Sequence, residues 1–350
     1  MQTFCTLFNV NYLDKGLTVY DSLVEVGADF ELYVLAMDDR CYEIISDLNY
    51  PHLIPIKLTD FENEDLLRVK MERSAGEYCW TCSSALVKYI LETFKPTQCA
   101  YIDADMYFYD DPKVMLEEMQ RRNASVQITG HRFYPDVAKK MSWRVGRYCV
   151  EYNTFLNNKE GNELLDIWAN QCLEYCATDG DGIHWADQKY MDNWVTDYEY
   201  AIETENLGAG VAPWNIGKYK LVSADRNNIQ LDCEGTRCRL LFYHFQSITY
   251  VDEHTANINA YSRRSTESKL VDLLYRPYLQ HIQRNKQLLK EKYGVEVLLT
   301  SHPGVKKPNV FMRMKSKLAA AVRYLYRSCV NKNTLYYSSI EAKKLNIMKF

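Results

Sequence analysis

Two acids stand one residue apart, Asp103 and Asp105, at the end of the apolar run Gln98-Cys99-Ala100-Tyr101-Ile102. If the run continues as a strand through both acids, their side chains point to the same side, because the side-chain period of a strand is two. Carboxylates this close repel each other unless a cation joins them. Hard oxygen ligands suit Mg²⁺ or Mn²⁺, and Mg²⁺ usually binds one or two carboxylates together with substrate phosphates. The pair therefore predicts a metal site for a nucleotide diphosphate; the alternative interpretation is a polar turn after a strand.

The segments around this pair alternate between strand and helix patterns. Apolar runs predict strands at residues 3–9, 30–36, 53–58 and 125–129, and helical spacing predicts helices at 16–26, 39–48, 83–94 and 112–121. In such α/β sheets, ligands bind beyond the carboxyl ends of the strands, so we expect Asn9, Tyr12 and Asp38 to contact a nucleoside there. The chain has neither a P-loop nor a GxGxxG motif, which leaves the phosphates to a metal ion and side chains.

Charge is unevenly distributed along the 350 residues. The net charge is −4, yet residues 304–350 carry eleven Lys or Arg and one acid, a net charge of +10. We predict a main domain at residues 1–255, a helical extension packing on it at 256–303 and a basic amphipathic tail at 304–350. Eleven cysteines without a visible secretory signal predict reduced thiols in a cytoplasmic protein. Pro277 is expected to kink or break a helix that begins near Leu270 and resumes at residues 282–292.

The tail itself has two opposed faces. Five apolar residues recur at helical spacing opposite four basic ones: Phe311, Met314, Leu318, Val322 and Leu325 against Arg313, Lys317, Arg323 and Arg327. This pattern predicts an interfacial helix on anionic lipid, and hence a peripheral protein on the inner face of the plasma membrane. The alternative is a surface helix that packs on the main domain. A nucleic-acid partner is not expected, because the few aromatic residues of the tail lie on its apolar side.

Four motifs, in chain order, carry a resemblance to a known family: Tyr101-Ile102-Asp103-Ala104-Asp105-Met106, Asp187-Gln188-Lys189-Tyr190, Ala212-Pro213-Trp214-Asn215 and Tyr243-His244-Phe245. Together they resemble bacterial nucleotide-sugar glycosyltransferases of the GT-A fold, in the family-eight-like group that builds cell-surface polysaccharides. The resemblance runs from about residue 3 to about residue 279 and implies an α/β fold, a Rossmann-like mixed sheet flanked by helices. It also implies transfer of a hexose from a nucleotide-diphosphate donor, expected to be UDP-linked, to a cell-surface glycan or lipid-linked acceptor.

The resemblance implies a metal set and a catalytic pair. Asp103, Asp105 and His244 match the ligands of a divalent ion, and imidazole is a good ligand for Mn²⁺. Asp187 and Gln188 match a pair near the reacting carbon and the acceptor; the alternative is that they cap the helix that follows.

Further residues are expected around the donor. Lys88 precedes the acid pair on a predicted helix, where relatives carry a basic residue near the diphosphate; the alternative is an exposed lysine. Ala104 and Trp214 complete the donor-binding set. Trp214 lies in a glycine-containing loop at residues 208–215, where its ring suits a sugar face, and the alternative is packing in the core. His131 and Arg132 follow a predicted strand and are candidates for acceptor binding.

One segment departs from the family pattern. Where relatives have a glycine-containing F-N-x-G strand, this chain has bulky Thr154 and Phe155, which predicts a different acceptor pocket. Family eight implies retention of the anomeric configuration, but no carboxylate is identified as base or nucleophile, so the stereochemistry stays open. The alternative functions are a sugar nucleotidyltransferase, which needs a phosphate loop that residues 9–16 lack, and a non-catalytic glycan-binding or membrane-scaffold protein.

Overall fold

The computed structural model describes residues 1–350 except 179–180, 226–227, 262–264, 298–338 and 350. The described strands are β1 (Gln2–Phe8), β2 (Phe30–Ala36), β3 (Leu53–Lys57), β4 (Gln98–Ile102), β5 (Met106–Phe108), β6 (Val126–Gly130), β7 (Tyr148–Leu156), β8 (Ala201–Glu203), β9 (Tyr219–Asp225), β10 (Asn228–Cys233), β11 (Thr236–Arg239), β12 (Phe242–His244), β13 (Thr249–Asp252), β14 (Thr255–Asn257) and β15 (Ile347–Lys349). The described α-helices are α1 (Leu13–Glu25), α2 (Asp39–Leu48), α3 (Leu58–Phe61), α4 (Glu64–Lys70), α5 (Ala75–Thr93), α6 (Lys113–Arg121), α7 (Pro135–Val145), α8 (Lys159–Glu174), α9 (Trp194–Asp197), α10 (Ser268–Tyr293) and α12 (Ser339–Leu345). Short 3-10 helices are η1 (Val10–Tyr12), η2 (Lys189–Asn193) and η3 (Ile216–Lys218).

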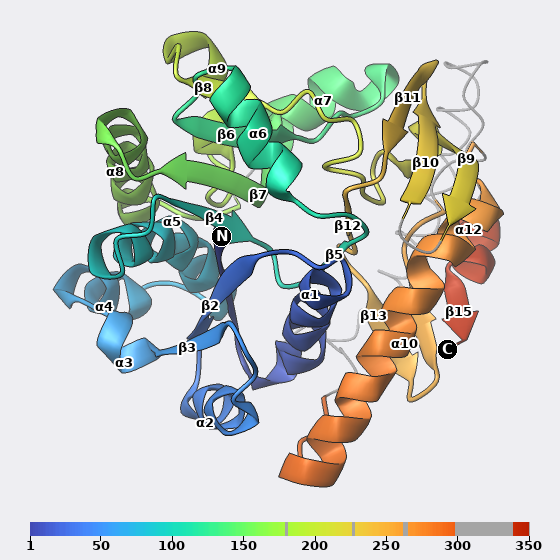
Figure 1. The fold of residues 1–350 in the computed structure, drawn as a ribbon, viewed down its shortest axis with the longest axis horizontal. Helices are drawn as coiled ribbons and strands as arrows, with labels where there is room; N and C mark the ends of the chain where they lie inside the picture. The colour runs from blue at the N-terminus through green and yellow to red at the C-terminus, as the bar shows by residue number, and fades with distance from the viewer. Residues whose placement is uncertain (179–180, 226–227, 262–264, 298–338, 350) are drawn as a thin grey trace, which may run out of the picture.

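A seven-stranded mixed sheet forms the centre of the molecule, in the order β3-β2-β1-β4-β7-β6-β8 (Figure 1). The first four strands in this order are parallel, and β7 runs antiparallel to both β4 and β6. Because β1, β2 and β4 are parallel, their carboxyl ends meet at one edge, which therefore receives Asn9, Asp38 and Asp103.

Alternating side chains of the sheet build a hydrophobic core on each face. In β1, Phe4 and Phe8 belong to the core with α1 and α2, whereas Cys5 and Leu7 belong to the core with α5 and α8. This is the two-residue period expected of a strand covered on both faces, and it explains the nearly continuous apolar sequence of β1. A third core packs α10 against β9, β10 and β12.

The predicted elements match the structure closely in the first hundred residues. β2 and α2 have the predicted bounds, while α5 begins at Ala75, eight residues before the predicted start. The earlier start follows from a capping box, in which Ser74 Oγ accepts from the Glu77 backbone and the Glu77 side chain accepts from the Ser74 backbone. The strand predicted to carry both acids is wrong: β4 ends at Ile102, and Asp103-Ala104-Asp105 form a turn that leads into β5.

The helix near the C-terminal end runs through its proline. The break predicted at Pro277 is wrong, because α10 extends without interruption from Ser268 to Tyr293. Leu274 and Tyr278, which flank the proline, are fully buried, so packing of this face against α1 and the third core offsets the missing backbone hydrogen bond. Figure 1 shows α10 beside α1 and the β9–β11 sheet.

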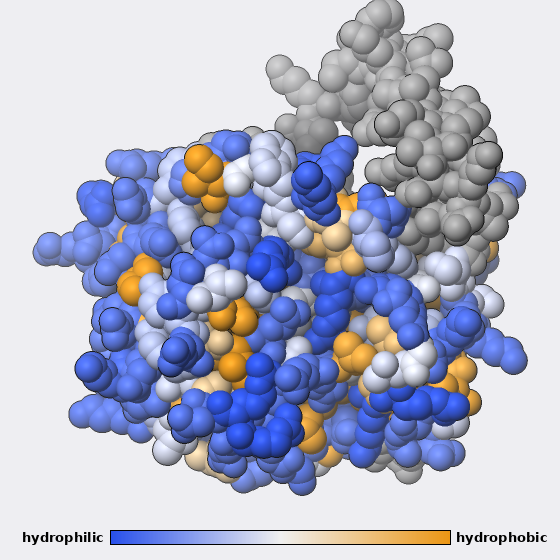
Figure 2. Space-filling view, turned by 90° about the horizontal axis from the view of Figure 1, so that it is seen from above, coloured by the Kyte–Doolittle hydropathy of each residue, from blue (hydrophilic) through white to orange (hydrophobic). Residues whose placement is uncertain are grey.

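Part of the predicted basic tail folds back onto the domain. β15 pairs antiparallel with β14, and Asn346 Oδ1 accepts from the backbone N–H of Tyr261. The amphipathic segment at residues 311–327 lies outside the described residues, and the domain boundaries stay a prediction. No described helix is long and apolar enough to cross a bilayer. The face seen in Figure 2 is largely hydrophilic, with hydrophobic residues in small separate groups, which is ordinary for a protein surface.

Candidate active site

A cavity of about 680 Å³ opens at the carboxyl edge of the sheet. It is lined by the residues that follow β1 and β4, by the start of β7, by the N-terminal turns of α5 and by the loop before η2. The structure brings nine of the eleven predicted site residues to this cavity: Asn9, Tyr12, Asp103, Ala104, Asp105, Asp187, Gln188, Trp214 and His244.

Three of these residues form a compact group of possible metal ligands. His244 Nε2 lies 3.0 Å from Asp105 Oδ1 and 3.5 Å from Asp103 Oδ2. One atom of each side chain lies within 4.8 Å of the others, close enough for one cation to reach all three. Two carboxylate oxygens and one imidazole nitrogen are a donor set that fits Mn²⁺.

Backbone pairing brings this group together across a long stretch of sequence. His244 of β12 pairs with Met106 of β5, directly after the acid turn. The N–H of Phe245 donates to Asp105 O at 2.8 Å, and the N–H of Asp103 donates to Glu151 O at 3.1 Å. The turn is thus held between β12 on one side and β7 on the other, which fixes the carboxylates beside the imidazole.

Burial shapes the charges of the acid pair. It raises the pKa of Asp103 to about 7, and repulsion from Asp105 adds to the effect while His244 opposes it. Burial also disfavours the charged form of Asp105, but attraction to His244 and Lys15 prevails and lowers its pKa. The two carboxylates therefore repel each other when both are ionised. A divalent cation bound between them would remove this repulsion.

Sequence reasoning missed Glu151, which lies behind His244. Its Oε2 is 2.6 Å from His244 Nδ1, and its side chain is fully buried in β7. The signal available in the sequence was an acid between the apolar residues Val150 and Tyr152, because a buried carboxylate is rare without a partner.

Asp187 is buried and held by a hydrogen bond. Ser83 Oγ donates to Asp187 Oδ2 at 2.6 Å, and Trp168 Nε1 donates to the Asp187 backbone carbonyl at 2.8 Å. Burial raises the pKa of Asp187 to about 7, although the hydrogen bond from Ser83 favours the ionised form. Gln188 Nε2 donates to Val145 O at 2.5 Å. The alternative role as a helix cap is wrong for both side chains, since no side-chain capping bond is present at η2 and Asp187 is bonded to α5.

Trp214 stands beside the metal-ligand group. Its ring lies edge-on to His244 with centroids 5.4 Å apart, and Trp214 Nε1 donates to His131 O at 2.9 Å. His131 also lines the cavity and stacks on Phe133 at 4.6 Å, and burial lowers its pKa to about 3. His131 is therefore neutral at physiological pH, and with Phe133 and Trp214 it forms an uncharged aromatic wall beside His244.

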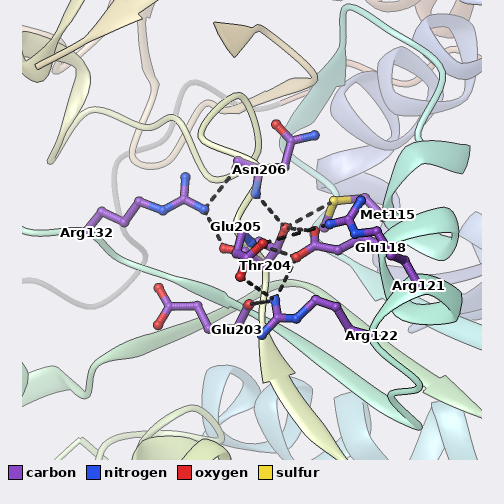
Figure 3. A network of polar contacts seen from close by, with 9 residues as sticks. All are labelled: Met115, Glu118, Arg121, Arg122, Arg132, Glu203, Thr204, Glu205 and Asn206. Carbon is purple, nitrogen blue, oxygen red and sulfur yellow. Dashed lines mark hydrogen bonds and ion pairs between the residues drawn. The ribbon is translucent and has the colours of Figure 1, made fainter. Parts of the chain in front are cut away.

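Arg132 has a structural role that the sequence did not predict. Its guanidinium donates to four backbone carbonyls, those of Thr204, Asn206, Leu207 and Ala209. Figure 3 shows the contacts with Thr204 and Asn206. These hydrogen bonds occupy the guanidinium. Arg132 therefore holds the loop that leads to Trp214, which is a different role from the predicted binding of the acceptor substrate.

Two predicted donor contacts lie away from the cavity. Lys88 Nζ pairs with Asp166 Oδ1 at 2.6 Å, because its position on α5 faces α8. Asp38 caps α2, accepting from Cys41 N at 2.7 Å and from Val10 N at 2.9 Å. Asp38 therefore shapes the backbone next to Asn9 but is not among the residues that line the cavity.

The two bulky residues predicted to reshape the acceptor pocket do not line the cavity either. Thr154 is buried within the sheet, and Phe155 stacks on Trp168 with centroids 5.7 Å apart. They lie near the C-terminal end of β7, whereas Cys149 and Val150 near its start face the cavity, and the different acceptor pocket stays a prediction.

Comparison of sequences identifies relatives of this chain. No family model matches it. It is 30% identical over 286 residues to the uncharacterized protein YfnD of Bacillus subtilis, an alignment that covers 80% of this chain and 88% of YfnD. The chain belongs to the YfnD family. A second member from Bacillus subtilis, the uncharacterized protein YfnF, is 26% identical over 298 residues, with 83% of this chain and 96% of YfnF covered.

Comparison of structures identifies the fold of this YfnD-family chain. The galactosyltransferase LgtC, in complex with donor and acceptor sugar analogues, superimposes with a TM-score of 0.51 at 10% sequence identity. The match covers 81% of this chain and 96% of LgtC. The fold is therefore the GT-A fold of glycosyltransferases, as the motifs predicted.

Proposed function

We propose that this YfnD-family protein is a metal-dependent glycosyltransferase. It transfers a hexose from a nucleotide-diphosphate donor, with UDP as the expected nucleotide, to a cell-surface glycan or a lipid-linked precursor. The observation that carries the proposal is the convergence of Asp103, Asp105 and His244 in one cavity that Asp187 and Gln188 also line. The GT-A fold supports it, since that fold is shared with a galactosyltransferase.

The residues have distinct tasks in this reaction. A bound Mn²⁺ or Mg²⁺ would neutralise the negative charge that develops on the departing diphosphate. Asp103, Asp105 and His244 would hold that ion, and Asn9, Tyr12 and Ala104 would face the donor. The buried carboxylate of Asp187 would stabilise positive charge at the anomeric carbon, most strongly because little water reaches it. Trp214 would pack its ring against a sugar.

Hydrolysis of a panel of nucleotide sugars with and without Mn²⁺ tests the proposal. We expect turnover of one donor class only in the presence of the ion. His244→Ala is expected to lose at least about 100-fold of that activity, since metal-ion charge stabilisation is worth several kcal/mol. The control is His281→Ala, because His281 is equally buried and also lies beside carboxylates, those of Asp21 and Glu25, but does not line the cavity.

Calorimetry separates the proposal from a glycan-binding scaffold. A transferase binds UDP more tightly with Mn²⁺ than without it, and the difference is lost in Asp103→Asn. Equal UDP binding with and without the ion, together with hydrolysis that His244→Ala leaves unchanged, would refute the metal-dependent function.

A further inference from the structure

Glu151 is a buried carboxylate with two links to the metal-ligand group. Its Oε2 lies 2.6 Å from His244 Nδ1, and its backbone carbonyl accepts from the N–H of Asp103 at 3.1 Å. The residue is fully buried in β7, where only the last residue is partly exposed. A carboxylate placed here costs folding free energy unless it is hydrogen-bonded, so its presence indicates a task.

We propose that Glu151 is a positioning residue that orients His244 for the divalent ion. The inference rests on the metal site of the proposed function and adds to it a residue that neither the sequence motifs nor the comparisons assign.

The geometry fixes which nitrogen of His244 faces the ion. The carboxylate oxygen 2.6 Å from Nδ1 holds a proton on that nitrogen, because a carboxylate only accepts. A cation would therefore replace the proton on Nε2, the atom that lies 3.0 Å from Asp105 and 3.5 Å from Asp103. In the other tautomer an N–H would point at the ion. A carboxylate behind a metal-binding histidine is a common way to set the tautomer and ring angle.

Glu151 is placed behind the ring and not in the cavity. Cys149 and His244 line the cavity, but Glu151 does not. Cys149, Glu151 and His244 also lie close enough to form a second ligand set. That set contains a thiol and would favour softer ions such as Zn²⁺, whereas the two aspartates with His244 favour Mn²⁺. The two arrangements differ in whether the Cys149 thiol binds the ion, so an experiment can distinguish them.

The neighbouring backbone leaves room for this carboxylate. Gly210 has φ +69°, and a Cβ at that position would lie 3.2 Å from Glu151 Oε1 and 2.7 Å from Thr129 Cγ2. A side chain at position 210 would therefore press on Thr129 and crowd Glu151. The glycine of the loop before Trp214 thus serves the packing around His244.

Binding of Mn²⁺ to the protein without nucleotide is the first test. The six-line electron paramagnetic resonance signal of free Mn²⁺ is titrated with wild type, Glu151→Ala and Glu151→Gln. We expect Glu151→Ala to bind Mn²⁺ about 10- to 100-fold more weakly, the usual loss when the hydrogen-bond partner of a metal-binding histidine is removed. The Mn²⁺ affinity of Glu151→Gln should lie between those of wild type and Glu151→Ala, because the Gln amide offers both an oxygen that accepts from Nδ1–H and an NH₂ group that donates to Nδ1.

Glu118→Gln is the matched control. Glu118 is a buried carboxylate that accepts from Arg122, Thr204 and the backbone of Glu205, in the network of Figure 3, and it has no contact with His244. Glu118→Gln is expected to lower the melting temperature and to leave the Mn²⁺ affinity as in wild type, which separates positioning from general destabilisation.

The ¹H shift and exchange rate of the His244 Nδ1–H in metal-free protein are the second test. We expect a far-downfield, slowly exchanging Nδ1–H in wild type and a less downfield, faster-exchanging one in Glu151→Gln, which preserves the volume of the side chain if Glu151→Ala does not fold. Wild-type Mn²⁺ affinity together with a wild-type Nδ1–H signal in the Gln variant overturns the proposal for Glu151 alone. A wild type that binds no Mn²⁺ overturns the metal site, and with it both the proposed function and this inference. A sulfur-to-metal charge-transfer band with Co²⁺ that Cys149→Ser abolishes would show the second ligand set and also overturn the inference.

Discussion

Replacing Ser83 with alanine should change the acidity of Asp187 without touching the cavity wall elsewhere. Ser83 Oγ donates to Asp187 Oδ2 at 2.6 Å, and both residues are buried. The hydrogen bond favours the ionised carboxylate, so its loss raises the pKa above the value of about 7 that burial produces.

The size of the change follows from the strength of the bond. A hydrogen bond to a charged group contributes about 1.5 to 3 kcal/mol, and one pKa unit corresponds to about 1.4 kcal/mol. The pKa of Asp187 in Ser83→Ala should therefore be about 8 to 9. At pH 7 the ionised fraction would fall from about half to between about a tenth and a hundredth. A bound cation lowers both pKa values, but the difference between the two proteins remains.

Two measurements check this prediction. The ¹³C shift of the Asp187 carboxyl is titrated in the free protein, and kcat/KM for donor hydrolysis is measured against pH. Because the proposed role needs the ionised form, activity should fall as pH decreases, and this acidic limb should move to higher pH by at least one unit in Ser83→Ala. The control is Ser84→Ala: Ser84 is equally buried on α5 but bonds to Thr81 O. Identical limbs in wild type and Ser83→Ala would refute the reasoning.

Three further predictions concern stability and location. Because the pKa of Asp187 is raised from 3.8 to about 7 on folding, its ionisation lowers the unfolding free energy as pH rises between these values. Asp187→Asn should thus be more stable than wild type at pH 8, by up to about 4 kcal/mol, and equally stable at pH 4. Urea denaturation measures both unfolding free energies, and the same difference between the two proteins at pH 4 and pH 8 would contradict this prediction. Arg132→Ala removes the hydrogen bonds to four carbonyls and should lower the unfolding free energy by about 2 to 4 kcal/mol, whereas Arg68→Ala, which loses an exposed pair with Asp65, should change it by under about 1 kcal/mol. We also expect replacement of four basic residues of the tail by glutamine to reduce flotation with anionic liposomes, since each Lys or Arg near such a surface contributes about 1 kcal/mol of binding free energy. Unchanged flotation would exclude the membrane role. These substitutions, unlike a truncation, keep β15 on β14, and the positions are Arg313, Lys317, Arg323 and Arg327.

Much of the parallel half of the sheet could be predicted from the sequence. The strands β1 and β2 are apolar on both faces because helices cover both, and an apolar run of this kind is visible without a structure. The edge at which Asn9 and Asp103 meet follows from the parallel direction of the strands. The GT-A fold was predicted from the resemblance of the four motifs to a known family: the acid pair follows β4 and His244 ends β12, whereas Asp187 and Gln188 lie between α8 and η2.

Prediction failed where a side chain had several possible partners. Lys88 has the charge that a diphosphate contact needs, but the packing of α5 on α8 gives it Asp166 instead. Arg132 likewise satisfies backbone carbonyls of a loop more than seventy residues away. Local sequence does not contain these partners, because they depend on how distant elements pack.

The acid pair shows most clearly which features could be predicted from the sequence and which depend on the tertiary structure. Its residue types and spacing, by elementary electrostatics, left two interpretations open, a divalent cation or a polar turn after a strand, and the other motifs favoured the cation. Only the tertiary structure decided that the pair lies in a turn, that His244 is brought beside it by the pairing of β5 with β12, and that Glu151 stands behind the imidazole. These contacts join residues that are far apart in the chain, and their geometry is set by strand pairing and by the packing of both sheet faces, which no short segment of sequence specifies.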